Sequence, residues 1–301
     1  MGAYPKLVHL KEGMRLGDRY KLIRPLGTGS MAEVWAARDR MSSDQVAIKV
    51  ISELMALSAQ ARRRFEREMR AVGAIHHPNV VEMLDHGQVE DGRPYLVMEL
   101  VDGDTFGSYL KQHGQLGARG VLVLVSQVLE GLEAAHDLGI IHRDLKPQNI
   151  YLAHLASGKR RVKILDFGVA HLLDFAAEAS GGRLTTTGSL VGSPRYMSLE
   201  VARGLPDIDQ RADIFGVGAT MYHALAGHPP FTGSGLGVLL NKIYNHDIPS
   251  LAAARPDLPG RLVRCVERSL AHEPGGRHAS ARELRLEVDA IAEEMRLAAE
   301  Q

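Results

Sequence analysis

The stretch His142-Arg143-Asp144-Leu145-Lys146-Pro147-Gln148-Asn149 says more about the fold and chemistry of this chain than any other. It places a carboxylate, an ammonium group and a carboxamide close together in one short segment. A carboxylate at Asp144 can orient a hydroxyl and accept its proton while a phosphoryl group is transferred. Lys146 can stabilise the charge of that group, and Asn149 offers a neutral oxygen ligand suited to Mg²⁺.

A second oxygen ligand follows in Asp166-Phe167-Gly168, at the end of an apolar segment that reads as a strand. The Asp166 carboxylate is anionic, whereas the Asn149 oxygen is neutral, and both are hard ligands of the kind that Mg²⁺ prefers. The two motifs at this separation are very unlikely to arise by chance. Together they predict a site for metal-assisted phosphoryl transfer.

The bulk composition describes an ordinary globular protein. The chain has 301 residues, of which 45% are hydrophobic and 24% charged, enough for roughly two domains of about 150 residues each. Lys+Arg and Asp+Glu both number 36, so the whole-chain charge does not indicate a nucleic-acid partner or an anionic membrane. The single cysteine, Cys265, excludes an internal disulfide and lies in an apolar helical pattern typical of a buried structural thiol.

No targeting or membrane segment is evident. The N-terminus mixes charges with short apolar stretches and lacks the continuous apolar core of a signal peptide. The most apolar run, 121–129, is interrupted by Ser126 and Gln127 and falls short of the ~20 residues that a membrane helix needs. We therefore expect a cytoplasmic protein with no membrane segment in this chain.

Hydrophobic patterns divide the chain near residue 101. The first third is β-rich and holds one main helix, at about 58–75, whereas most of the chain beyond the hinge at 101–104 is helical. We expect strands at 20–26, 32–38, 45–51, 80–86, 94–101, 150–152 and 162–165, and helices at 105–112, 119–138, 211–226, 235–245, 260–270 and 280–298. The last helix carries apolar residues at alternating four- and three-residue steps, which leaves a coiled-coil seam open beside an ordinary packed helix.

A glycine-containing turn joins the first two of these strands. The segment is Leu26-Gly27-Thr28-Gly29-Ser30-Met31-Ala32-Glu33-Val34. Glycines let a turn approach phosphate oxygens closely and offer backbone N–H groups to them. The motif is weak on its own, because Ala32 stands at the third glycine position and a structural hairpin explains the pattern about as well. A strand follows it and not a helix, so a dinucleotide fold is not indicated.

Lys49 lies on an apolar strand, in Val46-Ala47-Ile48-Lys49. An ammonium group between Ile48 and Val50 needs an anionic partner, because burying an unpaired charge is costly. Phosphate oxygens and a carboxylate would serve, and Glu68, on the predicted helix, is the carboxylate that we expect. A surface salt bridge is the alternative, but it would contribute little.

These motifs resemble those of the eukaryotic-type (Hanks-type) protein kinases over nearly the whole chain, with features similar to bacterial Ser/Thr kinases. The further segments that carry the resemblance are Asp18-Arg19-Tyr20, His77-Pro78-Asn79, Tyr95-Leu96-Val97-Met98-Glu99 and Ala226-Gly227-His228-Pro229-Pro230-Phe231. The resemblance implies an α+β, bilobal kinase fold. Residues 1–101 would form a small β-rich N-lobe with one main helix, and 102–301 a larger helical C-lobe.

The resemblance also implies a role for each matching residue. Asp144 matches the catalytic base, Lys146 the loop lysine of Ser/Thr kinases, Lys49 the phosphate-anchoring lysine and Glu68 its helix partner. Asn149 and Asp166 match the metal ligands. The ATP-binding set comprises the turn residues Leu26, Gly27, Thr28, Gly29, Ser30, Met31, Ala32, Glu33 and Val34, together with Ala47, Lys49, Met98, Glu99, Val101 and Tyr151. The implied cofactors are ATP and Mg²⁺, with Mn²⁺ as an alternative.

Regulation and bracing are implied in the same way. Arg143 directly before Asp144 implies that a phosphate on the activation segment, about 166–200, pairs with this arginine. Thr185 and Thr187 best match the phosphorylated positions of that segment. The alternative is that this Thr/Ser cluster is a polar flexible loop. Ser193 matches a residue that bonds the catalytic Asp and Lys. The resemblance further implies that Glu200 pairs with Arg277 and that Asp213 braces the backbone of the catalytic loop.

The chain departs from the family pattern where Ser198-Leu199-Glu200 stands in place of the usual Ala-Pro-Glu. Loss of the fixed proline could loosen the anchor of the activation segment, but it removes no catalytic atom. The expected partners are protein substrates bearing Ser or Thr, and the resemblance allows a homodimer through the N-lobe. Two other classes stay open. One is a pseudokinase scaffold, which the intact catalytic positions disfavour; the other is a small-molecule kinase, which Lys146 and the Glu200–Arg277 pair disfavour.

Overall fold

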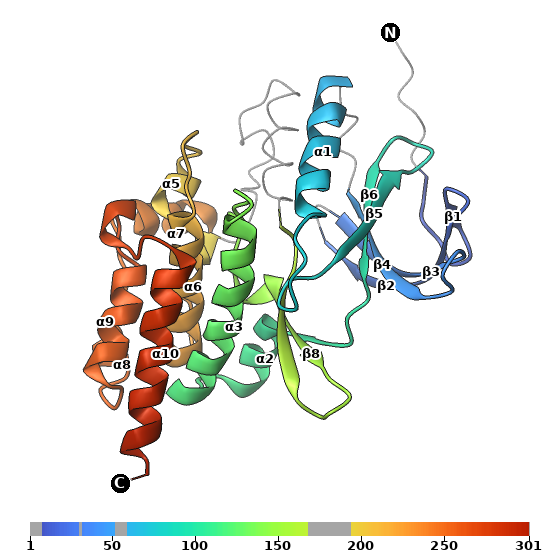
Figure 1. Cartoon of the computed structure of the whole chain (residues 1–301). Coiled ribbons are helices and arrows are strands. Elements are labelled where there is room, and N and C mark those ends of the chain that lie inside the picture. The colour runs from blue at the N-terminus through green and yellow to red at the C-terminus, as the bar shows by residue number, and fades with distance from the viewer. Residues whose placement is uncertain (1–7, 30–31, 52–58, 168–193, 301) are drawn as a thin grey trace. The chain divides into compact units, whose positions relative to one another are not determined.

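The computed structural model describes residues 8–29, 32–51, 59–167 and 194–300. These residues fall into two compact units (Figure 1). The first is formed by the described part of 1–76 with 81–102, and the second by 77–80 with the described parts of 103–171 and 184–301. The short segment 77–80 therefore belongs to the second unit, although its neighbours on both sides belong to the first.

The first unit is built on one antiparallel sheet. Its strands, in the spatial order β1-β2-β3-β4-β6-β5, are β1 (Arg15–Leu16), β2 (Tyr20–Thr28), β3 (Ala32–Asp39), β4 (Gln45–Ile51), β6 (Pro94–Glu99) and β5 (Met83–Gln88). Helix α1 (Ala59–Val72) follows β4 in the chain. The apolar residues on one face of these strands form a buried core that includes Tyr20, Leu22, Trp35, Ile48 and Val97, because alternate side chains of a strand point to the same face.

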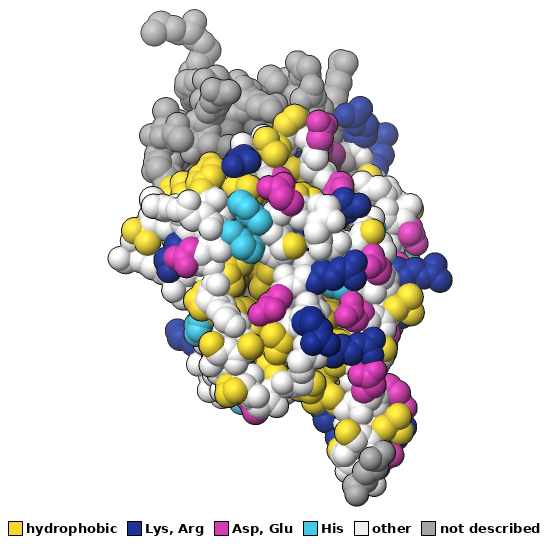
Figure 2. Space-filling view, turned by 90° about the vertical axis from the view of Figure 1, so that its left-hand side faces the viewer, with side chains coloured by type: hydrophobic (Ala, Val, Ile, Leu, Met, Phe, Trp, Pro, Cys, Tyr) yellow, Lys and Arg dark blue, Asp and Glu magenta, His cyan; other side chains and the backbone are white. Residues whose placement is uncertain are grey.

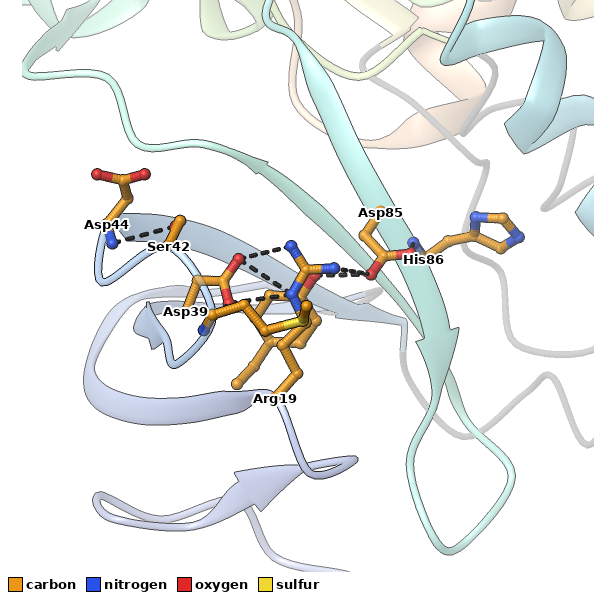
Figure 3. Close-up of polar contacts among 8 residues, drawn as sticks. Arg19, Asp39, Ser42, Asp44, Asp85 and His86 are labelled. Carbon is orange, nitrogen blue, oxygen red and sulfur yellow. Dashed lines mark hydrogen bonds and ion pairs between the residues drawn. The ribbon is translucent and has the colours of Figure 1, made fainter.

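A charged cluster ties three strands of this sheet together (Figure 3). The Arg19 guanidinium, just before β2, donates to Asp39 at the end of β3 at 2.6 Å and to Asp85 on β5 at 3.1 Å. The Tyr20 hydroxyl donates to the same Asp85 oxygen at 2.7 Å. The Arg19 side chain keeps 40% of its surface exposed, so the cluster lies at the border between core and solvent.

The second unit is mainly helical. Its helices are α2 (Phe106–His113), α3 (Ala118–His136), α5 (Leu199–Ala202), α6 (Arg211–Ala226), α7 (Leu236–Tyr244), α8 (Leu251–Ala254), α9 (Gly260–Ser269) and α10 (Ala281–Ala298). Helix α6 is buried nearly all round, as expected for a helix that is apolar on every face. Helices α3 and α10 pack along each other, as Figure 1 shows.

A small antiparallel sheet completes this unit, in the order β7-β8-β9. Its strands are β7 (Gly103–Thr105), β8 (Ile150–His154) and β9 (Arg160–Ile164). Gly103 has φ +149°, and a Cβ there would lie 2.2 Å from the Leu152 carbonyl oxygen. Only glycine fits this close approach of two backbones.

Most of the predicted elements are present, and three predictions need correction. The strand expected at 80–86 is β5, which starts later at Met83, because Val80 instead forms a bridge with Ile164 in the helical unit. Residues Gly103–Thr105 form a strand, although they were expected to be part of the hinge and the start of a helix. Strand β9 begins at Arg160, two residues before the strand expected at 162–165, so its connection to β8 is shorter than the two predicted strands imply. The last helix is an ordinary packed helix, since Leu284, Val288 and Ile291 are buried in its own unit.

The face of the molecule drawn in Figure 2 carries Lys/Arg and Asp/Glu side chains close to one another, with hydrophobic side chains scattered between them. Ion pairs of the described residues include Arg268 with Glu283, between α9 and α10, and Arg296 with Glu293, within α10. This mixing agrees with the equal numbers of basic and acidic residues in the chain. Of the described helices, none combines the length and apolar character that a membrane-spanning helix needs.

Candidate active site

One buried carboxylate, Asp213 in the first turn of α6, accepts hydrogen bonds from the backbone of the catalytic loop. Its Oδ2 atom accepts from the backbone N–H of His142 at 2.8 Å, and its Oδ1 from the backbone N–H of Arg143, also at 2.8 Å. Arg143 has φ +64°, a conformation that non-glycine residues adopt at a cost and that the surrounding structure must hold in place. The predicted bracing role of Asp213 is confirmed.

His136, at the end of α3, is a third partner of Asp213 that the sequence analysis missed. Its Nε2–H donates to Asp213 Oδ2 at 2.8 Å, and both side chains are almost fully buried. Burial alone would raise the pKa of Asp213, but the hydrogen bond and charge of His136, together with the backbone donors, hold it below its usual value. A histidine at the end of a mainly apolar helix is the signal that the sequence offers, and it does not identify the partner.

Asp144, Lys146 and Asn149 meet within hydrogen-bonding distance. The Lys146 ammonium donates to Asp144 Oδ2 at 2.6 Å. The Asn149 amide nitrogen donates to the backbone oxygen of Asp144 at 2.8 Å and to its Oδ2 at 3.3 Å. A short 3₁₀ helix, Pro147–Asn149, fixes this turn, with proline at its start where no N–H donor is needed.

The segment that carries Asp166 lies against the same loop. The Leu165 N–H donates to the Asn149 carbonyl oxygen at 2.8 Å, and His142 Nε2 donates to the Leu165 carbonyl oxygen at 2.7 Å. Asp166 itself has φ +63°, so both Arg143 and Asp166 adopt an uncommon backbone conformation next to the loop. These contacts bring the two predicted metal ligands into one region of the helical unit.

The donor set at this place fits a hard divalent cation. The Asn149 nitrogen is engaged by Asp144, which turns its carbonyl oxygen, Oδ1, into the atom available for a cation. A carboxylate from Asp166 and an amide oxygen are ligands that Mg²⁺ and Mn²⁺ accept.

The predicted ATP-binding residues of the β unit occupy neighbouring strands. Val34 on β3 lies opposite Lys49 on β4, and Ala47 on β4 lies opposite Met98 on β6. Glu68 is on α1 of the same unit. The remaining members with described positions are Leu26, Gly27 and Thr28 at the end of β2, Gly29 directly after it, Ala32 and Glu33 at the start of β3, Glu99 at the end of β6, and Val101.

Some predicted site residues lie elsewhere. Tyr151 is on β8 of the helical unit, opposite Thr105 and Lys163. Asp144, Lys146, Asn149 and Asp166 belong to that same unit. Ser30, Met31, Ser193 and the predicted phosphorylation sites Thr185 and Thr187 lie outside the described residues.

Glu200 and Arg277 form the predicted pair, so that prediction is confirmed. Arg277 donates to both carboxylate oxygens, at 2.6 and 3.0 Å, and its side chain is fully buried. It also donates to the carbonyl oxygens of Ala271, Arg211 and His272. Burial would raise the pKa of Glu200, but Arg277 outweighs it and holds the pKa below the usual value. The pair forms with Leu199 in place of proline, and Leu199 is buried.

A small pocket opens beside the Asp144 loop. Its lining includes Arg143, Asp144, Tyr196, Met197 and Val201. The Tyr196 hydroxyl is hydrogen-bonded to His223 Nδ1 at 2.7 Å, and burial raises the pKa of Tyr196 to about 12. Tyr196 is therefore a neutral wall of this pocket at any physiological pH.

Residues 20–261 match the model of the protein kinase domain. The chain belongs to the protein kinase family. The kinase is 34% identical over 286 residues to the serine/threonine-protein kinase pkn3 of Myxococcus xanthus, covering 94% of this chain and 52% of the relative. It is 35% identical over 277 residues to the serine/threonine-protein kinase PknB of Mycobacterium tuberculosis, covering 91% of this chain and 43% of the relative.

A solved structure agrees with this assignment. The kinase domain of PknI from Mycobacterium tuberculosis matches with a TM-score of 0.74 and 30% sequence identity, covering 94% of this kinase and 100% of that domain. The expected α+β kinase fold of bacterial Ser/Thr type, with a β-rich N-lobe and a helical C-lobe, is therefore confirmed. The chain spans about half the length of the curated relatives it matches.

Proposed function

We propose that this chain is an active serine/threonine protein kinase that transfers the γ-phosphoryl group of ATP to Ser and Thr hydroxyls of proteins. The observation that carries the proposal is the Asp144–Lys146–Asn149 arrangement on a loop whose backbone is held by Asp213. The kinase family uses ATP and a divalent metal, and the names of the relatives identify them as serine/threonine kinases.

Each polar group of the loop has a proposed task. The Asp144 carboxylate orients the acceptor hydroxyl and takes its proton as the new P–O bond forms. Lys146 lies 2.6 Å from that carboxylate and is placed to stabilise charge on the transferring group. Asn149 and Asp166 hold the divalent cation, which we propose to be Mg²⁺, with Mn²⁺ able to replace it; the cation and ATP supply the activated phosphoryl group.

In the N-lobe, Lys49 and Glu68 are proposed to position the ATP phosphates, the Leu26–Val34 turn to cover them, and Met98, Glu99 and Val101 with Ala47 to bind adenine. We propose Tyr151 as the C-lobe wall of the adenine site and the lobes as 1–101 and 102–301. The strand pairing supports this proposal. Val34 on β3 lies opposite Lys49 on β4, and Met98 on β6 lies opposite Ala47 on β4, so both residues are next to the strand that carries Lys49.

Regulation through the activation segment is the second part of the proposal. Phosphate on Thr185 or Thr187, added by the kinase itself, would pair with Arg143 and order the segment. The buried Glu200–Arg277 pair supports a fixed end for that segment. Mass spectrometry of fully active protein tests the point, since absence of phosphate from 185–189 would contradict it.

We infer protein substrates, a cytoplasmic location and no nucleic-acid partner. We also propose a homodimer through the N-lobe, whose exposed apolar side chains include Met41 at 80% and Leu84 at 46% exposure. Light scattering on the wild type and on Met41→Ser plus Leu84→Ser tests it, and a monomer at all concentrations would contradict it.

The decisive assay incubates the chain with labelled ATP, Mg²⁺ and a generic protein substrate, followed by acid hydrolysis of the product. The proposal predicts labelled phosphoserine and phosphothreonine and no phosphotyrosine. ATP binding without any transfer would instead favour a scaffold. Transfer only to small hydroxyl compounds such as aminoglycosides would favour a small-molecule kinase.

A further inference from the structure

Cys265, His278 and Glu287 lie together where α9 meets the start of α10, in a part of the helical unit that the proposed reaction does not use. The Cys265 Sγ, one ring nitrogen of His278 and one Glu287 oxygen all lie within 4.8 Å of one another. Cys265 and His278 are buried, at 1% and 0% exposure. A thiol, an imidazole and a carboxylate are the ligand types that Zn²⁺ takes in proteins.

Hydrogen-bond partners lie beside both ring nitrogens of His278. The Ser269 hydroxyl lies 3.0 Å from the Cys265 carbonyl oxygen, and because a carbonyl can only accept, the single hydroxyl proton is committed to that bond. The Ser269 oxygen must therefore accept from His278 Nδ1, which lies 3.3 Å away.

This tautomer turns a lone pair toward a carboxylate. With a proton on Nδ1 only, the His278 ring would present Nε2 as an acceptor to Glu287 Oε2 at a distance of 2.8 Å. Two acceptors at that distance need a positive charge between them, either a second ring proton or a metal ion. Arg268 also approaches Glu287, but only to 3.7 Å and from an exposed position, so it does not fill the place between the two atoms.

We propose that Cys265, His278 and Glu287 bind one Zn²⁺ ion through Sγ, Nε2 and Oε2. A ring proton would engage only two members of the cluster, whereas a metal ion engages the thiol as well. The Nε2–Oε2 distance would widen from 2.8 Å to about 3.3 Å, the separation that follows from tetrahedral bonds of about 2.0–2.1 Å. Glu287 has 26% of its side chain exposed, which gives it room to move and gives the ion a path of entry.

Zinc binding at this site releases one proton. The Cys265 thiol carries a proton that a metal ion has to displace, because the thiolate is the form that ligates a metal. Binding forms the Zn–S bond and releases that proton to solvent. Ser269 then serves as the outer partner that accepts from Nδ1–H and keeps Nε2 directed at the metal.

The site would fix one turn of the fold. His278 directly follows Arg277, whose guanidinium holds Glu200. A metal ion between α9, this turn and α10 would therefore stabilise the support of the Glu200 anchor without touching the catalytic loop. The expected readouts are metal affinity, absorption spectrum and thermal stability.

The experiment uses the whole chain, freed of metal with a chelator, in excess Mg²⁺ so that oxygen-ligand sites are filled. Titration with Zn²⁺ is expected to show one site and to raise Tm, and Co²⁺ is expected to give the ultraviolet charge-transfer band of a thiolate ligand. Cys265→Ser should abolish that band. Loss of an outer partner already weakens metal binding about 10–100-fold, so Glu287→Gln should weaken zinc binding at least tenfold.

Glu294→Gln is the matched control, because Glu294 is an exposed α10 glutamate that pairs with Arg261 on α9, and it should bind Zn²⁺ as the wild type does. Circular dichroism of each variant establishes that it is folded. The wild type itself provides the second test, since it needs no substitution. Absence of a thiolate–cobalt band in folded wild type, or zinc binding that Cys265→Ser and Glu287→Gln leave unchanged, would overturn the proposal.

Discussion

The two lobes each contain an arginine clamped by carboxylates, and the two clamps differ in burial. In the C-lobe, the Arg277 side chain is fully buried and the Glu200 side chain only 9% exposed. In the N-lobe, the Arg19 side chain is 40% exposed; of its two partners, Asp85 is 35% exposed and Asp39 5% (Figure 3). The same chemical groups should therefore contribute very differently, because a charge that stays in water loses little when its partner is removed.

Asp213 in the helical lobe is a buried charge with more hydrogen-bond donors around it than Glu200. Its carboxylate is fully buried and accepts from two backbone N–H groups and from His136. If the carboxylate is lost, these buried donors cannot form replacement hydrogen bonds with water. We conclude that buried charge in the C-lobe fixes the catalytic loop, whereas the Arg19 cluster only joins strand ends.

Asp213→Asn should give the largest effect. The amide can accept through only one oxygen and places an NH₂ group against buried donors, each of which costs about 1–3 kcal/mol when unsatisfied. Turnover should fall by about 100-fold or more as Asp144 shifts, with unfolding free energy lowered by several kcal/mol. Asp209→Asn, at an exposed position just before α6, is the control. Wild-type turnover in folded Asp213→Asn would show that the brace is not needed.

Arg277→Met should come second. It leaves the Glu200 charge buried and unpaired, which costs about 3–5 kcal/mol. Urea unfolding measures the loss. Adding Glu200→Gln to Arg277→Met should recover part of it, because the unpaired charge is then gone. If the double variant were as unstable as the sum of the two single ones, the clamp would not act as a pair.

Acid should weaken the C-lobe clamp next. The folded-state pKa of Glu200 lies below its ordinary value, so its contribution is fully present above the unfolded-state pKa of about 4.3. The contribution is lost as the pH falls through the lowered folded-state pKa. Urea unfolding between pH 7 and 3 should show stability decreasing with acid, with a shallower decrease in Glu200→Gln. An equal slope in both proteins would contradict the linkage.

Arg19→Gln should give the smallest effect. The carboxylates left behind keep other donors, Asp39 the Met41 N–H and Asp85 the Tyr20 hydroxyl, so the expected change in unfolding free energy is about 1 kcal/mol or less, decreasing further in high salt. Urea unfolding at low and high salt measures it. A loss as large as that of Arg277→Met would remove the distinction between the two clamps.

Much of this architecture could be predicted from the sequence, because the motifs fix a known arrangement. The pairing of Glu200 with Arg277 and the bracing by Asp213 were both expected and are both observed. Local patterns failed where a partner distant in sequence decides the conformation. Val80 reads as a strand residue of the first sheet but bridges Ile164, and Gly103 reads as hinge but pairs with Ala153 on β8.

The missed polar contacts have a similar cause. His136 contacts Asp213 across 77 residues of sequence, and His278 meets Cys265 and Glu287 only because α9 packs against α10. The sequence shows that these side chains lie in apolar surroundings. It does not show which lone pair faces which donor, because that depends on the packing of several helices.

The most direct test of the central claim compares the wild type with Asp144→Asn in single-turnover transfer from labelled ATP. The carboxylate is the group that the braced loop presents to the acceptor hydroxyl, and loss of a general base typically costs about 10²–10⁴-fold in rate. We predict a fall in this range with ATP affinity unchanged. Turnover within a few-fold of the wild type would contradict the assignment of Asp144 and, with it, the account of why the loop is held.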